Sequence, residues 1–403
     1  MKQRLFSFFL YRSRFVDPWI FAASVPLLLI ETRLGGAAAI LYAAIGVWDF
    51  TGRHKSMRWT DLRLLVPCLA FGFYALGTYL YAGLHNPDCL NRMPSHVYII
   101  VLPFVAVGLV LVKQPLKWIS LGAKIALAYL SIIALFSMLS TAERVGFGTN
   151  PALAVYFIMM LGCCCRFDQT KTGQAFFYLS ILPASATATR IALVFYAVIL
   201  IYDLGVLAKH FMRSKNTSAS IKLAGALLVG IFLAGFMAIR SPVIQQRYND
   251  TFIEITQIAT GQGQGSLRIR SYITEAGIET FWSAPIVGAG LCQSIANIKT
   301  KVAIIDPDLN YYFFHNMVLD VLAQFGLIGF ALFCWFCFAV VRALWPVNPE
   351  WREPTIILLV MIFIYGLSGS FLSDERMTAA TMLIFGALIN EKRRSQIWAR
   401  IRS

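Results

Sequence analysis

The sequence has few charged residues and lacks the short motifs that mark nucleotide-driven or zinc-dependent enzymes. Only 14% of its 403 residues are charged, and 58% are hydrophobic. About a quarter of the residues in a soluble domain are charged, so this composition excludes an ordinary soluble domain. The chain contains no GxxxxGK(S/T) phosphate loop, no GxGxxG turn and no HExxH helix. ATP-driven and zinc chemistry therefore have no support in the sequence.

The eight cysteines follow no metal-binding spacing. Three of them, residues 163–165, are consecutive within an apolar run, and Cys334 and Cys337 form a CxxC inside another. A CxxC within an apolar segment is more often a packing feature than a redox centre. We therefore expect no metal site, no cofactor and no disulfide framework.

Apolar stretches of membrane-spanning length recur along almost the whole sequence. They predict an all-α, polytopic integral membrane protein with about twelve transmembrane helices. The stretch LPASATATR around Pro183 is a candidate break within one of them. The expected spans are 17–31, 35–50, 63–83, 97–113, 118–140, 150–165, 173–187, 190–210, 221–239, 314–341, 354–371 and 377–390. The chain then divides into helices 1–9 (residues 1–239), a loop domain (240–313), and helices 10–12 with a basic tail (314–403).

Basic residues are distributed unevenly between the connections. The net charge is +15, and basic clusters lie in the N-terminal arm, in residues 51–63 and 209–222, and in the C-terminal tail. With this set of spans the clusters fall on one face, whereas the opposite connections carry single arginines. Because basic loops stay in the cytoplasm, we expect both termini there. This topology explains the positive charge without a nucleic-acid partner.

The connection at 240–313 differs from the others in its length. A structureless loop of this size is unusual, so we expect it to be folded on the non-cytoplasmic side. Ser241 and Pro242 predict the start of one helix, and LRIRSYITEAGIETFWSAP predicts a second that ends near Pro285. The segment IVGAG then predicts a turn, after which the chain returns to the membrane.

The expected topology brings four reactive side chains to one membrane boundary. His315 opens the tenth span and Arg190 the eighth, while Arg268 and Arg270 begin the second loop helix. Arginine matches phosphate oxygens with two parallel hydrogen bonds, and an imidazole can exchange a proton near neutral pH. Arginines clustered around a histidine are therefore suited to binding an anionic substrate. Because Arg268 and Arg270 are two residues apart, we expect only one of them to face the site.

Each of these residues also has a structural explanation. Arg190 could extend to the membrane interface, Arg268 or Arg270 could belong to a solvated helix face, and an interfacial His315 could simply be hydrogen-bonded. A second group of residues is a candidate for holding the acceptor, the basic ones on charge alone: Asn316, Arg240, Arg247, Lys299 and Lys301.

Two acidic residues of the second loop helix share a face. Glu275 and Glu279 have i,i+4 spacing. Such a pair could act in acid–base catalysis or bind a metal, although a solvated helix face is the simpler interpretation.

Two segments together resemble the bacterial O-antigen ligase and O-antigen polymerase superfamily. They are RIRSYITEAGIETFWSAPIVGAG and HNMVLDVLAQFGLIG. Members show an arginine, a later proline, a GxG, and then a His-Asn that opens a helix carrying LxxxGxxG. The matching positions are Pro285, Gly288, Gly290, Gly326 and Gly329. Members often carry a tryptophan shortly after the arginine, where this chain has Ile273, so the resemblance does not distinguish Arg268 from Arg270.

The resemblance implies a glycosyltransferase of the bacterial inner membrane. Such ligases move a glycan from undecaprenyl diphosphate to a sugar hydroxyl of lipid A-core at the periplasmic face, without a nucleotide or metal. Arg190 and one of Arg268 or Arg270 would then bind the donor diphosphate. His315 would be the general base of an inverting displacement. The implied partners are the lipid-linked donor, the lipid A-core acceptor and membrane lipids.

Three other functions share parts of this pattern. An O-antigen polymerase would use a second carrier-linked glycan as its acceptor, and a protein O-oligosaccharyltransferase would use a Ser or Thr hydroxyl. One large outer loop favours the ligase over the polymerase, and no additional C-terminal soluble domain is expected, which argues against the protein glycosylator. An anion or lipid transporter would need ionisable groups near mid-membrane, for which Lys124 is the obvious candidate.

Overall fold

The computed structural model is helical over the residues it describes and contains no strand among them. Those residues are 39–47, 59–85, 95–109, 112, 114–140, 144–213, 242–259, 266–305, 311–345 and 349–402. Among them, five helices are long and apolar enough to cross a membrane. The all-α class is confirmed, and these helices agree with a polytopic membrane protein. The expected spans at 17–31 and 221–239 lie outside the described residues.

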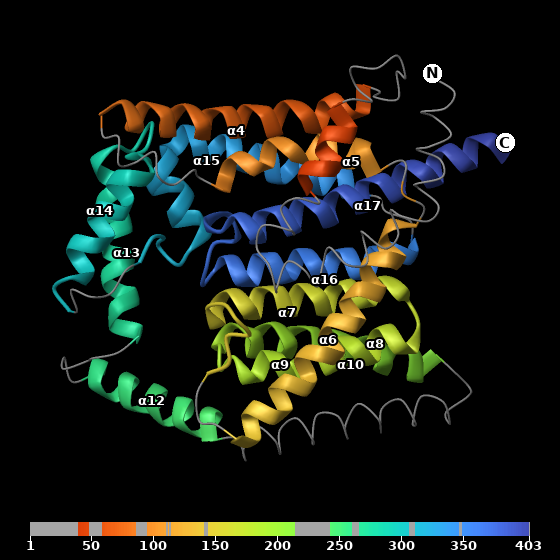
Figure 1. The fold of residues 1–403 in the computed structure, drawn as a ribbon, viewed down its shortest axis with the longest axis horizontal. Helices are drawn as coiled ribbons and strands as arrows, with labels where there is room; N and C mark the ends of the chain where they lie inside the picture. The colour runs from red at the N-terminus through yellow and green to blue at the C-terminus, as the bar shows by residue number, and fades with distance from the viewer. Residues whose placement is uncertain are drawn as a thin grey trace.

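The long helices form a bundle in which most members run side by side, while α6 crosses obliquely (Figure 1). They are α4 (Trp59–His85), α6 (Pro115–Ser140), α7 (Pro151–Cys165), α10 (Arg190–Arg213), α15 (Met317–Leu344), α16 (Pro349–Gly366) and α17 (Glu375–Arg402). The shorter elements are η2 (Ser95–Val101), α5 (Leu102–Gly108), η4 (Arg166–Asp168), α8 (Lys171–Leu179), α9 (Ile181–Ala186), α12 (Pro242–Ala259), α13 (Ser266–Ser283), α14 (Gly290–Val302) and η5 (Phe371–Ser373).

The centre of the bundle is α7, which is apolar on all sides. Its residues from Leu153 to Cys165 are all buried, because α6, α8, α9, α16 and α17 surround it. A helix that is hydrophobic all round needs such an enclosed position. The three consecutive cysteines therefore lie in the packed core.

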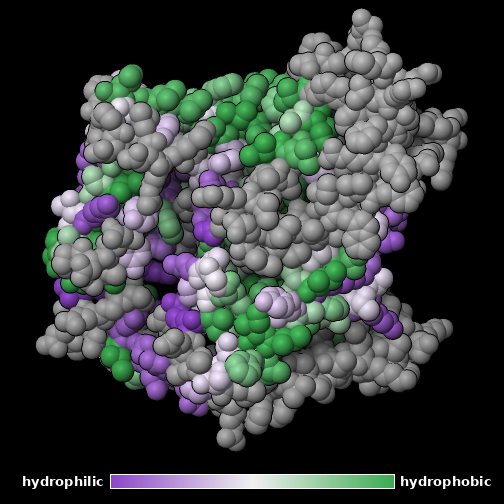
Figure 2. Space-filling view, in the orientation of Figure 1, coloured by the Kyte–Doolittle hydropathy of each residue, from purple (hydrophilic) through white to green (hydrophobic). Residues whose placement is uncertain are grey.

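Large apolar side chains point outward from the bundle. Phe136 is 73% exposed and Ile201 is 70% exposed. Figure 2 shows hydrophobic residues over the bundle, and many hydrophilic residues of this face gathered toward the end at which α12 and α13 lie. Exposed apolar surface of this kind is suited to contact with lipid.

Two expected spans are not single α-helices. The span 173–187 is divided into α8 and α9, which meet at Ser180, and Ala188 then has a φ of +49° before α10 begins. The break lies on both sides of Pro183 rather than at it, because a proline fits within the first turn of a helix. The span 97–113 consists of the 3₁₀ element η2 followed by α5, which has Pro103 in its first turn.

A buried ion cluster holds the end of the bundle at which α16 begins, opposite the start of α15. Arg166, which is 5% exposed, donates to both carboxylate oxygens of Asp203 at 3.0 Å and pairs with Glu353 at 3.0 Å. Its guanidinium carbon lies 4.7 Å from the ring centroid of Phe177. The cluster joins η4, α8, α10 and α16, so this arginine acts as a structural centre rather than as a solvated residue of a basic loop.

Replacement of Arg166 tests this role. We expect Arg166→Met to lower the free energy of unfolding by about 3 kcal/mol, because it leaves the largely buried Asp203 without its cation. The measurement is the thermal unfolding midpoint of the purified protein in detergent. Arg342→Met, at an exposed position of α15, provides the control. Equal midpoints for the two variants would contradict a structural role for the cluster.

Candidate active site

The helices α13 and α14 lie side by side at one end of the bundle (Figure 1), where both pack against α15. A small apolar core joins the three elements: Ile273, Ala276, Ile298, Val302, Phe314 and Ala323. The helix expected to end near Pro285 is α13, which ends at Ser283. The helix α14 was not expected, because the sequence predicted only a turn and a return to the membrane there. The predicted turn is present at residues 285–287, but α14 follows it, because Ile298 and Val302 are buried in a core shared with α13.

The helix α15 is interrupted at Gly326, whose φ of +62° and ψ of −165° are not helical. Such a break frees backbone N–H groups that an apolar environment would leave unpaired. Here the N–H of Leu327 donates to the carbonyl oxygen of Pro285 at 2.8 Å, and that of Ile328 donates to Ile286 at 3.1 Å. The segment after α13 therefore completes the hydrogen bonding of α15.

The glycines of this junction are required by the close approach of two backbones. Gly288 has a φ of +85°, and a Cβ atom on it would lie 2.3 Å from the carbonyl oxygen of Gln324. A Cβ atom on Gly326 would lie 2.4 Å from the carbonyl oxygen of Ile286. Both positions belong to the motif identified in the sequence, so the motif describes the junction between α13 and α15.

His315 lies in a turn immediately before α15. Its φ of +54° is in the left-handed region, which residues other than glycine adopt rarely. The next residue, Asn316, is the N-cap of α15, and its side chain accepts a hydrogen bond from the N–H of Leu319 at 3.0 Å. The imidazole is edge-on to the rings of Phe313 and Tyr311, with centroid separations of 4.4 and 5.4 Å. The turn is thus fixed at the start of a helix and lined by aromatic rings.

A cavity of about 330 Å³ brings this turn together with α13. Its polar lining comes from Arg270 and Thr274 on α13, from His315 and Asn316, and from Ser368 after α16. The remaining lining residues are apolar: Ile278, Phe314, Val318, Leu319, Leu322 and Leu367. Two of the four predicted site residues therefore share one cavity, which has a charged end and an apolar wall.

Burial and the neighbouring positive charge keep the imidazole of His315 neutral. Burial, and in second place the guanidinium of Arg270, lower the pKa of His315 to about 4. Partial burial and the charge of Arg190 lower the pKa of Arg270, although an arginine stays protonated at neutral pH. The two arginines and the histidine therefore form one electrostatic group, in which the histidine is a free base at pH 7.

Arg190 has a partner that the sequence did not suggest. Its Nη2 atom lies 3.2 Å from a carboxylate oxygen of Glu254 on α12, and the carboxylate is 10% exposed. The two residues are 64 positions apart, so no local pattern could connect them. Arg270 forms no ion pair with any described residue, which leaves it as the charged donor that faces the cavity.

The other predicted residues on α13 and α14 do not line the cavity. The guanidinium of Arg268 lies 5.7 Å from the ring centroid of Tyr272, and the ammonium of Lys299 lies 5.8 Å from that of Tyr312. Arg240 lies outside the described residues, and only the position of residue 247 in α12 is described.

The carboxylates of α13 have a common partner on α14. Lys301 pairs with Glu275 at 3.2 Å and with Glu279 at 2.7 Å. The described residues contain no cluster of acids, histidines or cysteines that could hold a metal. An acceptor phosphate at Lys301 would have to compete with both carboxylates.

One cysteine is disulfide-bonded, although the sequence indicated no disulfide framework. Cys292 on α14 is disulfide-bonded, whereas Cys334 and Cys337 are free thiols on α15. This disulfide was not predicted, because cysteine spacing alone does not determine which cysteines pair.

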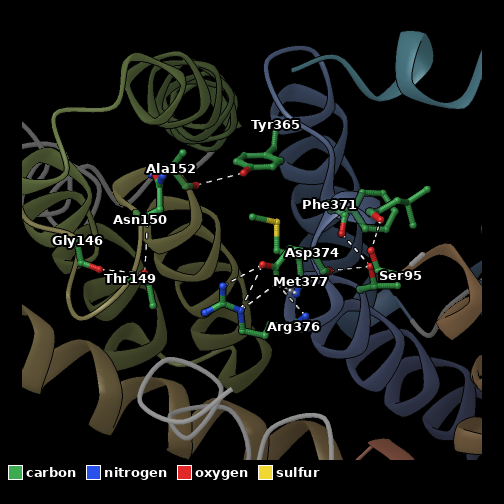
Figure 3. A network of polar contacts seen from close by, with 12 residues as sticks. Ser95, Gly146, Thr149, Asn150, Ala152, Tyr365, Phe371, Asp374, Arg376 and Met377 are labelled. Carbon is green, nitrogen blue, oxygen red and sulfur yellow. Dashed lines mark hydrogen bonds and ion pairs between the residues drawn. The ribbon is translucent and has the colours of Figure 1, made fainter. Parts of the chain in front are cut away.

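Figure 3 shows polar contacts between α16 and α7 and within the turn that leads into α17. Tyr365, whose hydroxyl donates to Ala152 at 3.2 Å, lies within electrostatic range of Arg270. Asp374 binds the guanidinium of Arg376 at 2.9 Å and accepts from its backbone N–H at 2.9 Å. This ion pair offsets the charge of Asp374 immediately before α17.

These features define a class: a helical membrane protein in which guanidinium groups and a neutral imidazole meet at the end of apolar helices. Residues 175–334 match the family model described as O-antigen ligase. The match supports membership of the O-antigen ligase/polymerase superfamily, whose members are glycosyltransferase-like ligases and polymerases. The matched region runs from α8 into α15 and includes Arg190, Arg270 and His315. No curated protein matches the sequence.

The junction between α13 and α15 can be tested with one added methyl group. We expect Gly288→Ala to lower the thermal unfolding midpoint and the amount of folded protein, because its Cβ would overlap the backbone of α15. Gly77→Ala on α4 is the matched control, since a Cβ there meets nothing within 4 Å. A Gly288→Ala protein as stable as the control would contradict the close approach.

Proposed function

We propose that this protein is an O-antigen ligase. It transfers a glycan from undecaprenyl diphosphate to a sugar hydroxyl of lipid A-core, at the periplasmic face of the bacterial inner membrane. The observation that carries the proposal is that Arg270 and His315 line one cavity within the segment that matches the O-antigen ligase family.

The arginines suit the departing diphosphate. When the anomeric C–O bond breaks, its electron pair stays on the diphosphate, whose negative charge increases. Arg270, with Arg190 nearby, offers charge-assisted hydrogen bonds that strengthen as this charge develops. Removal of one such donor typically costs about 3 kcal/mol, or roughly a hundredfold in rate. Arg190 would exchange the carboxylate of Glu254 for a phosphate oxygen when the donor binds.

His315 suits the attacking hydroxyl. A sugar hydroxyl is a weak nucleophile, and its proton must leave as the new C–O bond forms. The neutral imidazole accepts this proton, a contribution of roughly 10²- to 10⁴-fold. The negative donor also offsets the charge of Arg270, which raises the pKa of the histidine in the complex and makes it a stronger base. Displacement from the side opposite the diphosphate inverts the anomeric centre.

The apolar wall suits the lipid part of the donor. Ile278, Val318 and Leu322 line the cavity beside the charged end. The isoprenoid units next to the diphosphate would lie against these side chains and displace water. Exclusion of water would limit hydrolysis of the donor.

Two observations support a periplasmic site. Disulfides persist in the periplasm and are rare in the cytoplasm, so the disulfide of Cys292 favours a periplasmic position for α14. The basic clusters of the sequence favour cytoplasmic termini and the same orientation.

Replacement of His315 is the direct test of the mechanism. We expect His315→Ala to lower the transfer rate by about 10²- to 10⁴-fold, because the base is lost while the diphosphate contacts remain. The measurement is transfer of a labelled glycan from undecaprenyl diphosphate to lipid A-core by the purified protein. Thr300→Ala, at an exposed position of α14, is the control. Near-normal transfer by a folded His315→Ala protein would exclude a base at this position.

The pH dependence tests the electrostatic group. Because the pKa of His315 is lowered to about 4, we expect kcat/KM for the donor to hold from pH 7 to pH 5 and to fall as the imidazole protonates near pH 4. Arg270→Gln should move this acid limb upward, toward the ordinary value of about 6.5, in addition to slowing transfer. Because burial is the larger cause, the shift should be partial. Arg268→Gln should leave the limb in place, and equal shifts for the two variants would contradict the assignment.

A deletion strain separates the ligase from its relatives. A ligase deletion accumulates carrier-linked polymer and loses long chains on lipopolysaccharide, whereas a polymerase deletion leaves single units on the core.

The transporter alternative has weaker support, because Lys124 is paired with Asp168. Anion flux in proteoliposomes without glycan transfer would favour that alternative.

A further inference from the structure

Asp320 is a buried carboxylate for which the chemistry above provides no role. It lies in the first turn of α15 and is 1% exposed. None of the described lysines and arginines forms an ion pair with it. A buried carboxylate without a cation is unfavourable unless hydrogen bonds compensate it. The hydrogen bonds of Asp320 must therefore offset the cost of burying its carboxylate.

Those contacts hold both ends of the turn that carries His315. The Oδ1 atom of Asp320 accepts a hydrogen bond from the backbone N–H of Phe314 at 2.7 Å. Its own backbone N–H donates to the carbonyl oxygen of Asn316 at 2.9 Å. The residues immediately before and after the histidine are thus both attached to Asp320.

The turn needs such attachment because its conformation is unfavourable. His315 has a left-handed φ of +54°, which costs free energy in a residue with a Cβ atom. Backbone strain of this kind persists only where the surroundings fix it. Without the bond to Phe314, the turn could relax to an ordinary backbone conformation. The imidazole would then move away from Arg270, with which it shares the cavity.

We propose that Asp320 is a positioning residue, which acts through the N–H of Phe314 to hold the imidazole of His315 in the cavity. This proposal rests on the function proposed above, in which the imidazole of His315 is the general base. The competing explanation is that the carboxylate only stabilises the N-terminus of α15 through the helix dipole. In that case its loss would lower stability without a specific effect on turnover.

The test compares two replacements in the purified full-length protein, with undecaprenyl diphosphate-linked glycan and lipid A-core as substrates. Asp320→Ala removes the acceptor for Phe314, and we expect kcat to fall about a hundredfold with little change in KM, because a misplaced base is costly. Asp320→Asn keeps a side-chain oxygen at the same place without the charge. We expect the asparagine variant to recover most of kcat.

A double replacement tests whether the effect passes through the histidine. In a His315→Ala background, Asp320→Ala should add no further loss of residual transfer, because both changes remove the same contribution. An additional loss as large as that in the wild-type background would overturn the proposal. A folded Asp320→Asn protein as inactive as His315→Ala would also overturn it, even if Asp320→Ala fails to fold.

The same experiment separates this inference from the proposed function. If His315→Ala retains transfer, the base assignment fails whatever Asp320 does. If His315→Ala abolishes transfer and a folded Asp320→Ala protein keeps its kcat, only the positioning role fails.

Discussion

The backbone hydrogen bonds at the break in α15 determine how the candidate site is assembled. A helix interrupted in apolar surroundings leaves N–H groups that cannot be satisfied by water. The carbonyl groups of Pro285 and Ile286 accept from the two N–H groups beyond Gly326, so α13 cannot move independently of α15. Because α13 carries Arg270 and α15 begins beside His315, the same bonds fix the cation relative to the imidazole. These backbone bonds therefore help to set the relative position of the two side chains, together with the bond from Phe314 to Asp320.

The two ends of the bundle use arginine in different ways. At one end, Arg166 is buried. It forms ion pairs with two carboxylates and lies over an aromatic ring, so groups within the protein compensate its charge. At the other end, Arg270 has no ion pair among the described residues, and Arg190 shares one carboxylate while 41% of its side chain remains exposed. A compensated cation stabilises the fold, whereas an uncompensated one beside a cavity favours binding of an anion.

Much of this arrangement could be predicted from the sequence, and the remainder shows why some of it could not. Apolar length predicted the helices, and the order of the motifs predicted that α13 and the start of α15 lie close together, as their shared cavity shows. Because Arg268 and Arg270 point in different directions from one helix, only Arg270 reaches the cavity. The helix α14, the partner Glu254 and the bond of Asp320 to Phe314 depend on tertiary contacts that leave no periodic signal. The sequence pattern identifies which residues can react, while packing determines how they are held.

The pairing of Arg190 with Glu254 has a consequence for turnover in the proposed reaction. The diphosphate becomes more negative when the glycan leaves, so the cations that stabilise the transition state also bind the product more tightly than the donor. A site composed only of unpaired arginines would then release its carrier slowly. In that reaction the buried carboxylate of Glu254, 3.2 Å from Arg190, would compete with the diphosphate for the same guanidinium. It would weaken the binding of donor and product alike and leave Arg270 as the stronger contact in the cavity.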